Sequence, residues 1–214
     1  MNKKPYIRVA DILLERSVND SADYAEKNMQ NALLFFDETK QSMWLYCLKQ
    51  IKFHGLIAEF GVYNGKSINY ISSLLPNNKI YGFDSFIGLK EDWVGWEWSK
   101  GDFSLGGVLP KVNQNVELVP GFFDESLPEW LQKNKGEFSF INIDCDTYES
   151  SKTVLSLLGP ERIVPGTIII FDEYFGYNNW RNHEHKAWKE FVEKNNINYE
   201  YIAINHLQVA ILVK

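Results

Sequence analysis

The sequence predicts an α/β fold in which helices cover both faces of a mostly parallel β-sheet. Beyond Gly55, short apolar runs alternate with stretches of helical periodicity, and this pattern calls for parallel strands joined by right-handed crossovers. The last two apolar runs follow each other across a turn at Asn205 and His206, so we expect them to form an antiparallel hairpin. The expected sheet is therefore mixed and contains seven strands.

The chain divides into two unequal parts. From about Tyr6 to Lys52 the apolar residues recur at roughly helical spacing, so residues 1–54 are predicted to be a helical extension that acts as a lid or an oligomer contact. Residues 55–214 form the predicted α/β domain. Its strands are expected at 56–62, 79–84, 116–119, 138–144, 167–172, 199–205 and 207–213, and its helices at 66–75, 126–134, 150–158 and 184–195.

Composition argues against several classes of function. A chain of 214 residues with 45% apolar and 15% aromatic residues can bury one sizeable core. A formal charge of −6, without a long Lys/Arg stripe, argues against a nucleic-acid partner. The sequence shows no signal peptide or long apolar span, and Cys47 and Cys145 lack metal-ligand spacing. We therefore expect a cytoplasmic protein that acts on a small molecule and has no membrane partner.

Carboxylates stand where apolar strands are predicted to end. The runs Phe138–Asp146 and Thr167–Glu173 both finish in acids, and Glu59 and Asp84 close two earlier strands. The carboxyl ends of parallel strands lie along the edge of the sheet where ligands bind. Four strands are therefore predicted to deliver acids to one active-site crevice.

A glycine turn follows the first of these strands. Gly61 and Gly65 would let the backbone approach a ligand closely, and the helix that begins near Ser67 offers free N–H groups. The spacing is too short for a Walker phosphate loop, and the third glycine of a dinucleotide fingerprint is missing. Asp84 ends the next strand, where an acid can accept both ribose hydroxyls. A nucleoside without a pyrophosphate fits this pattern best.

The segment from Ser85 to Pro110 has no sustained periodicity. It contains five glycines together with Trp93, Trp96 and Trp98, and it is long for a passive connection. Two interpretations remain open at this stage. The tryptophans either pack over the sheet edge or form a lid whose rings stack on a sugar or another flat ligand.

Five ordered segments resemble one known family. The segments AEFGVYNGKS, YGFDSFIGL, VELVPGFFDESLP, INIDCDTYESS and PGTIIIFDEY look like the class I S-adenosylmethionine-dependent methyltransferases of the macrocin O-methyltransferase type, over roughly residues 55–191. The resemblance implies a Rossmann-like fold and a magnesium-assisted transfer of a methyl group to a sugar hydroxyl. It also suggests a homo-oligomer.

The resemblance also implies roles for individual residues. It assigns three metal ligands, Asp144, Asp172 and Glu173, although the family often has Asp where this chain has Glu173. Hard oxygen donors of this kind suit Mg²⁺ or a similar divalent cation. The implied cofactor contacts are Glu59, Gly61, Tyr63, Gly65 and Ser67 at the methionine end and turn, Asp84 and Ser85 at the ribose, and Gly121 and Phe122 at the adenine.

The chemistry needs a base as well as a cation. A sugar hydroxyl is a poor nucleophile at neutral pH, so a metal must stabilise the developing alkoxide while a carboxylate removes the proton. Asp146 is the first candidate for the base, Asp144 is the alternative, and His185 is a third. For His185 an ordinary position on a helix surface is the favoured interpretation.

Other functions remain open on the sequence alone. The same fold and cofactor could serve a phenolic acceptor or a chemistry like that of cephalosporin hydroxylases. A non-catalytic module that binds S-adenosylmethionine or a glycan is the third alternative, because a fold does not by itself determine a function.

Overall fold

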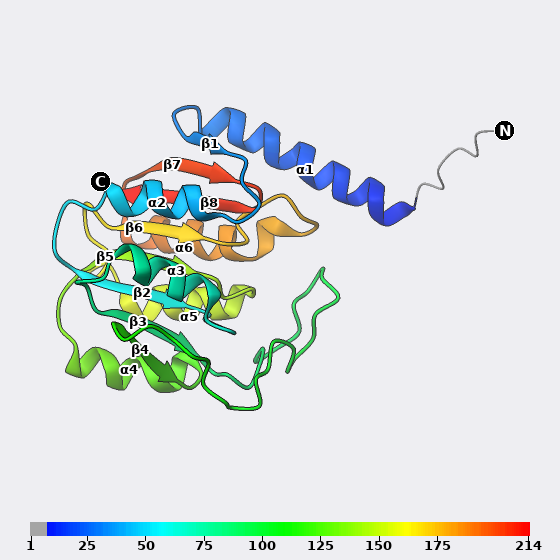
Figure 1. Cartoon of the computed structure of the whole chain (residues 1–214). Helices are drawn as coiled ribbons and strands as arrows, with labels where there is room; N and C mark the ends of the chain where they lie inside the picture. Colours follow the sequence, from blue (N-terminus) through cyan, green and yellow to red (C-terminus); the bar gives the residue numbers. More distant parts are fainter. Residues whose placement is uncertain (1–7) are drawn as a thin grey trace.

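The computed structural model describes residues 8–214, which form one eight-stranded sheet with helices on both faces (Figure 1). The spatial order of the strands is β1-β7-β8-β6-β5-β2-β3-β4. The strands are β1 (Leu33–Phe35), β2 (Leu56–Phe60), β3 (Ile80–Asp84), β4 (Val116–Pro120), β5 (Phe138–Ile143), β6 (Ile168–Phe171), β7 (Tyr199–Asn205) and β8 (Gln208–Val213). The helices are α1 (Val9–Asn28), α2 (Gln41–Lys49), α3 (Lys66–Leu74), α4 (Phe123–Lys133), α5 (Tyr148–Leu158), η1 (Trp180–Asn182) and α6 (Glu184–Asn195).

The predicted mixed sheet is confirmed. All neighbouring strands pair in parallel except β8, which is antiparallel to both β6 and β7. The central strands read as unbroken apolar runs because they are covered on both faces, and every residue of β5 and β6 is buried. The helices α2 and α3 pack on one face, and α4, α5 and α6 pack on the other.

The N-terminal part differs from the predicted helical extension. The segment Leu33–Phe35 is a strand that pairs in parallel with β7 and adds an eighth strand at the sheet edge. The apolar residues of this segment recur at helical spacing, so a helix was predicted, and this prediction is wrong. The segment is a strand because pairing with β7 decides its local structure. Residues 1–7 of the predicted extension, including Tyr6, lie outside the described residues.

Two further features position the site. The α1 helix runs along the β1 end of the sheet, and its N-terminal half extends beyond it, while the segment after β3 forms a long loop at the opposite end (Figure 1). Within residues 8–214, no helix combines the length and the apolar character that a membrane crossing requires. Cys47 and Cys145 are buried free thiols.

Candidate active site

A cavity of about 760 Å³ opens at the carboxyl edge of the sheet. Its walls come from the turn after β2, the ends of β3 and β5, the turn before α4, the segment after β6 and the long loop after β3. This is the edge at which ligands bind in open α/β sheets. The sequence analysis predicted a crevice at this place, and the structure has one.

The turn after β2 requires its first glycine. Gly61 has a φ of +91°, and a Cβ added there would overlap the carbonyl oxygen of Asp144. The amide of Gly61 donates to the carbonyl of Phe83 at 2.9 Å, and the amide of Asp144 donates to the carbonyl of Phe60 at 2.8 Å. The glycine therefore lets the ends of β2, β3 and β5 meet at the cavity wall.

The predicted cofactor contacts divide into two sets. Three of them lie outside the cavity lining: Glu59, Gly65 and Ser67. Six line the cavity, namely Gly61, Tyr63, Asp84, Ser85, Gly121 and Phe122. The structure thus brings together the turn, ribose and adenine contacts that the family resemblance implies, and it places Glu59 beneath them in the core.

Asp84 is held in place by backbone amides. Its Oδ2 accepts from the N–H groups of Val62 at 2.8 Å and Tyr63 at 2.7 Å, and its Oδ1 accepts from Phe86 at 2.7 Å. A carboxylate has about four acceptor sites, so one remains available for a ligand hydroxyl. Asp84 both fixes the turn after β2 and faces the cavity.

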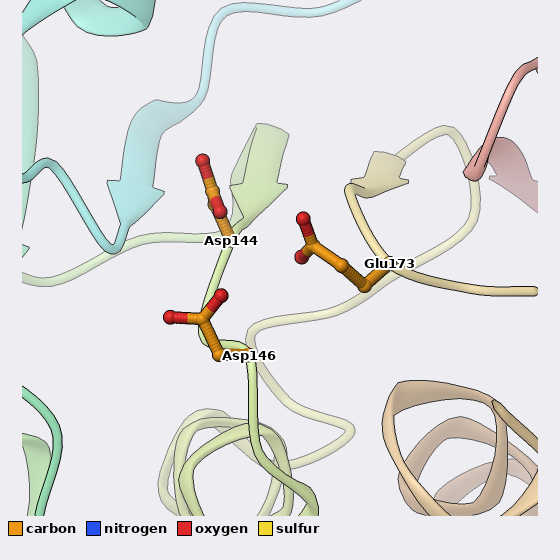
Figure 2. A group of neighbouring side chains, drawn as sticks. All are labelled: Asp144, Asp146 and Glu173. Atoms are coloured by element: carbon orange, nitrogen blue, oxygen red, sulfur yellow. The ribbon is translucent and has the colours of Figure 1, made fainter. Parts of the chain in front are cut away.

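Three acidic side chains converge at the inner end of the cavity. Asp144, Asp146 and Glu173 each offer an oxygen, and these oxygens lie within 4.8 Å of one another (Figure 2). Burial is the main cause that raises the pKa of all three carboxyls, repulsion from the nearby Asp172 is the next cause in each case, and the pKa of Asp146 reaches about 7. Carboxylates so close together resist joint ionisation unless a cation lies between them.

The donor set of this cluster fits a hard divalent cation. All three groups are carboxylates, the ligands that Mg²⁺, Mn²⁺ and Ca²⁺ prefer. One oxygen of Glu173 is buried without a hydrogen-bond partner among residues 8–214. Asp146 has a φ of +63°, an uncommon backbone conformation for a residue other than glycine, which turns its side chain into the cluster.

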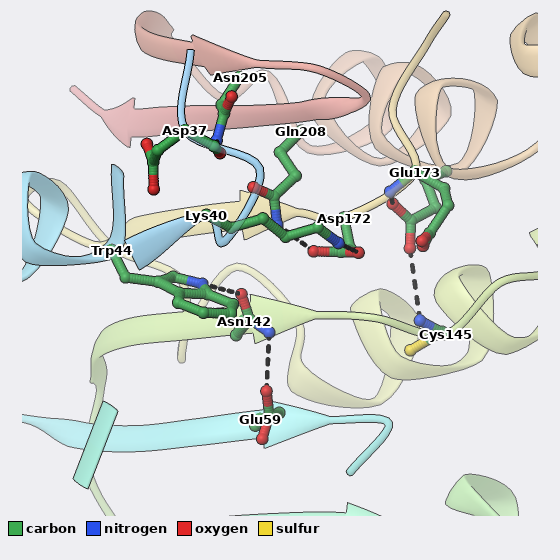
Figure 3. A network of polar contacts seen from close by, with 11 residues as sticks. Asp37, Lys40, Trp44, Glu59, Asn142, Cys145, Asp172, Glu173, Asn205 and Gln208 are labelled. Atoms are coloured by element: carbon green, nitrogen blue, oxygen red, sulfur yellow. Dashed lines mark hydrogen bonds and ion pairs between the residues drawn. The ribbon is translucent and has the colours of Figure 1, made fainter. Parts of the chain in front are cut away.

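Asp172, predicted as a ligand, lies outside this cluster. Its carboxylate pairs with the ammonium of Lys40 and accepts from the amide of Gln208 (Figure 3). Successive residues at the end of an extended strand point in opposite directions, which separates Asp172 from Glu173. Burial opposes the charge on Lys40, but the attraction of Asp172 outweighs it and raises the pKa of this lysine. The third acid of the cluster is Asp146, whereas the family resemblance implied Asp172.

Glu59 belongs to a buried polar chain. The side-chain NH₂ group of Asn142 donates to Glu59 at 2.9 Å, and the side-chain oxygen of Asn142 accepts from the indole N–H of Trp44 at 3.3 Å (Figure 3). Burial raises the pKa of Glu59 to about 8, against the opposing effects of the Ser67 and Asn142 side chains. Glu59 therefore joins β2 to β5 within the core and lies outside the cavity lining.

His185 lies away from the cavity. It is only 9% exposed, so the interpretation as an ordinary surface histidine is wrong. Its ring packs edge-on against Tyr24, Tyr174 and Trp180, with ring centres 4.8–5.1 Å apart. Burial, followed by the charge of Arg181, lowers its pKa to about 4. The ring does not line the cavity, so this geometry gives it no place beside a reacting hydroxyl.

The tryptophan loop packs over the sheet edge through one ring, and its role as a lid for a ligand stays a prediction. Trp93 is buried and packs on Trp96 and Tyr177, with ring centres 5.4 and 6.3 Å away. Trp96 and Trp98 are more than a third exposed, and all three tryptophans line the cavity. The loop is therefore anchored by one indole and presents two others to whatever occupies the cavity.

Sequence reasoning missed three residues that organise this site. Lys40 and Gln208 hold Asp172, yet they are 132 and 36 residues away from it in the chain, and nothing near them in the sequence indicates the contact. Glu184 accepts hydrogen bonds from the backbone of Cys145 and Glu173. Its place at the start of a helix is an ordinary position for an acid, so only the structure distinguishes it.

More than half of the chain is similar to a known protein family. A family model described as "Methyltransferase domain" matches residues 58–174, more than half of the chain. The chain belongs to this family. The match runs from β2 to the residues just after β6 and so includes the glycine turn, Asp84 and all three acids of the cluster. No curated protein matches the chain.

Solved structures agree with the family. CalS11, a TDP-rhamnose 3′-O-methyltransferase of calicheamicin biosynthesis, is 23% identical with a TM-score of 0.60, covering 81% of this chain and 78% of its own. The O-methyltransferase NovP is 21% identical with a TM-score of 0.61 and the same coverage. At this level of identity the likeness shows the fold. The fold of these methyltransferases and the match to the family model agree.

Proposed function

We propose that this methyltransferase transfers a methyl group from S-adenosylmethionine to a hydroxyl of a sugar or a glycosylated small molecule, with the help of a divalent cation. One observation carries the proposal. The cluster of Asp144, Asp146 and Glu173 borders the same cavity as the glycine turn and Asp84. A cation site and a donor site that share one cavity can serve one transfer reaction.

The donor side is formed by the turn after β2 and the ends of β3 and β4. Gly61 and Tyr63 face the methionine end, Asp84 and Ser85 face the ribose, and Phe122 borders the adenine. Because Asp84 is already held by three backbone amides, it needs little reorganisation to accept a ribose hydroxyl. Donor binding is therefore expected without the cation.

The acceptor side is formed by the acid cluster and the tryptophan loop. A cation held by Asp144, Asp146 and Glu173 would lower the pKa of the acceptor hydroxyl and stabilise the developing alkoxide. Asp146 is our first candidate to take up the hydroxyl proton, and Asp144 is the second. Trp96 and Trp98 enclose the acceptor and exclude water from the sulfonium group.

The choice of a sugar acceptor has three supports. The sequence segments resemble macrocin-type O-methyltransferases, and CalS11 bears a name that specifies a nucleotide-linked sugar. Exposed indole rings beside the cavity offer flat apolar surfaces of the kind that pack against a ring-shaped ligand. The same rings would suit a phenol, so phenols belong in the test.

The test combines binding with turnover. Thermal melting with S-adenosylmethionine, with and without Mg²⁺, should show stabilisation by the donor in both cases. Methyl transfer should then be measured on nucleotide-linked sugars, free glycosides and phenols, with Mg²⁺ or with excess chelator. We expect turnover of a sugar only when the metal is present. Full activity in chelator would overturn the proposed metal dependence, and a preference for phenols would overturn the proposed sugar acceptor. Donor binding without turnover of any acceptor would overturn the proposed enzyme and support the non-catalytic module.

A further inference from the structure

Glu184 is a buried carboxylate next to the acid cluster. It is the first residue of α6 and has no exposed surface. Its Oε2 accepts from the backbone N–H of Glu173 at 3.0 Å, and its Oε1 accepts from the backbone N–H of Cys145 at 3.4 Å. One side chain from α6 thus joins the segments that follow β5 and β6.

Those two segments carry all three acids of the cluster. Cys145 stands between Asp144 and Asp146, and the other amide belongs to Glu173 itself. The strands β5 and β6 end at Ile143 and Phe171, and backbone hydrogen bonds between neighbouring strands continue for one more residue, from Asp144 to Phe60 and from Asp172 to Ile143. The next amides along the chain, those of Cys145 and Glu173, donate to Glu184. The Glu184 carboxylate therefore restrains the two segments beyond the point where strand pairing stops.

A simpler explanation would make Glu184 an ordinary acid in the first turn of a helix. Such an acid is usually solvated and interacts with the N–H groups of its own helix. Glu184 instead is fully buried, and its two oxygens accept from amides that lie 39 and 11 residues earlier in the chain. Burial of a carboxylate is costly unless both oxygens are satisfied, so the position demands a specific compensation.

A second explanation would make Glu184 a metal ligand. Its two oxygens, however, are already directed at backbone amides, and the oxygens that converge within 4.8 Å belong to Asp144, Asp146 and Glu173. Glu184 also does not line the cavity that these three acids border.

We propose that Glu184 is a positioning residue that fixes the spacing of Asp144, Asp146 and Glu173 for a divalent cation. The inference rests on the metal site of the proposed function. Groups that orient metal ligands commonly change metal affinity about 10–100-fold when they are removed. Glu184 acts through hydrogen bonds to the backbone of the ligand segments, so it touches neither the donor nor the acceptor.

The test replaces Glu184 by glutamine. Glu184→Gln keeps the shape but has one acceptor oxygen, so its NH₂ group meets a backbone N–H where the carboxylate accepted one. Glu193→Gln on the exposed side of the same helix is the matched control. Mn²⁺ affinity should be measured by electron paramagnetic resonance, donor affinity by calorimetry without metal, and exchange of the Cys145 and Glu173 amides by NMR.

We expect Glu184→Gln to bind Mn²⁺ about 10–100-fold more weakly than the wild type, with donor affinity within about twofold. The Cys145 and Glu173 amides should exchange faster, and the control should match the wild type in all three measurements. A wild type that binds no Mn²⁺ would overturn the metal site and this inference together. Wild-type Mn²⁺ affinity in the variant, or a parallel loss of donor affinity, would overturn only the positioning role.

A shortened acid covers the case in which Glu184→Gln does not fold. Glu184→Asp keeps the charge and both acceptor oxygens but withdraws them by one methylene. We expect its Mn²⁺ affinity to lie below that of the wild type, again without a parallel loss of donor affinity. An unchanged Mn²⁺ affinity in this variant would count against the positioning role in the same way.

Discussion

The carboxylates at the cavity edge fall into two groups that differ in their partners. Asp84 and Asp172 accept from strong donors: backbone amides in one case, the ammonium of Lys40 and an amide in the other. Asp144, Asp146 and Glu173 face one another. A carboxylate with donors stabilises the chain around it, whereas a group of carboxylates without them is costly until a cation arrives. Hydrogen-bond donors already hold the first group in place, whereas the second group has an arrangement that a cation would stabilise.

The contact of Asp172 with Lys40 also shows how the N-terminal part of the chain packs against the predicted domain. Lys40 lies between β1 and α2, outside the predicted methyltransferase domain, yet it reaches the residue that follows β6. The amide of Asn205 in β7 donates to the carbonyl of Asp37 at 3.0 Å. The segment around Lys40 thus contacts the predicted domain at two points, Asp172 and Asn205.

Removing one acid from the cluster of Asp144, Asp146 and Glu173 gives the largest expected effect, a loss of methyl transfer. Asp144→Asn should lower methyl transfer on the order of 10³-fold, because the cation would lose a ligand that stabilises the alkoxide. Stability should be unchanged or higher, since the variant removes a buried charge whose neighbours are also acidic. Steady-state kinetics with a donor-binding titration measures both. Full activity would show that this cluster takes no part in the reaction.

A paired comparison of two variants tests which acids hold the metal. Asp146→Asn should weaken Mn²⁺ binding by at least about 10–100-fold, the range known for groups that only support ligands. Asp172→Asn should change it less, because its carboxylate is engaged by Lys40 and Gln208. Mn²⁺ titration of both variants gives the answer. The reverse order would restore the ligand set that the sequence resemblance implies, with Asp172 turning toward the cation.

Much of the fold follows from local patterns. The buried strands are continuous apolar runs, and α6 begins and ends at the predicted residues. The strand β1 was missed because three residues carry no period of their own and depend on pairing with β7. The α4 helix begins at Phe123, three residues before the predicted start at 126, because Asp124 and Glu125 occupy its first turn.

The candidate site was predictable in outline and not in its side-chain directions. Strand order explains why the acids that follow or end β3, β5 and β6 meet at one edge, and this needs only the alternation of strands and helices; Glu59 of β2, predicted as the fourth, lies in the core instead. The separation of Asp172 from Glu173 depends on which way each side chain leaves the strand end, and on a lysine 132 residues away. Such long-range partners leave no mark in the local sequence.

Glu59 shares a feature with each of the two groups of carboxylates, and its raised pKa allows a test in which the pH is varied. One of its oxygens accepts from Asn142, and the other is buried without a partner among residues 8–214. Its pKa is raised from 4.5 to about 8, so the folded state holds this proton more tightly than the unfolded state does. The associated stability is therefore full below about pH 4.5 and is lost as the pH rises toward 8.

Glu59→Gln should remove this pH dependence. Between pH 5.5 and 7.5 the wild type should lose about 2 kcal/mol of unfolding free energy that the variant keeps. Urea unfolding at both pH values, in chelator, gives the difference between the two proteins and cancels the contribution of the acid cluster. The same slope in both proteins would mean that Glu59 is ionised in the fold and has a partner on its second oxygen.

The ion pair of Lys40 gives the smallest expected effect and compares a half-buried pair with an exposed one. Lys40→Met should cost about 1–2 kcal/mol of unfolding free energy, because Asp172 is left buried with Gln208 as its remaining donor. Lys133→Met is the control, since its partner Glu129 lies one helical turn away and both side chains are exposed, so the loss should stay below about 0.5 kcal/mol. Equal losses in urea unfolding would place the Lys40 pair with ordinary surface pairs. A larger loss for Lys40→Met that Mn²⁺ reverses would show that a cation can take the place of the ammonium.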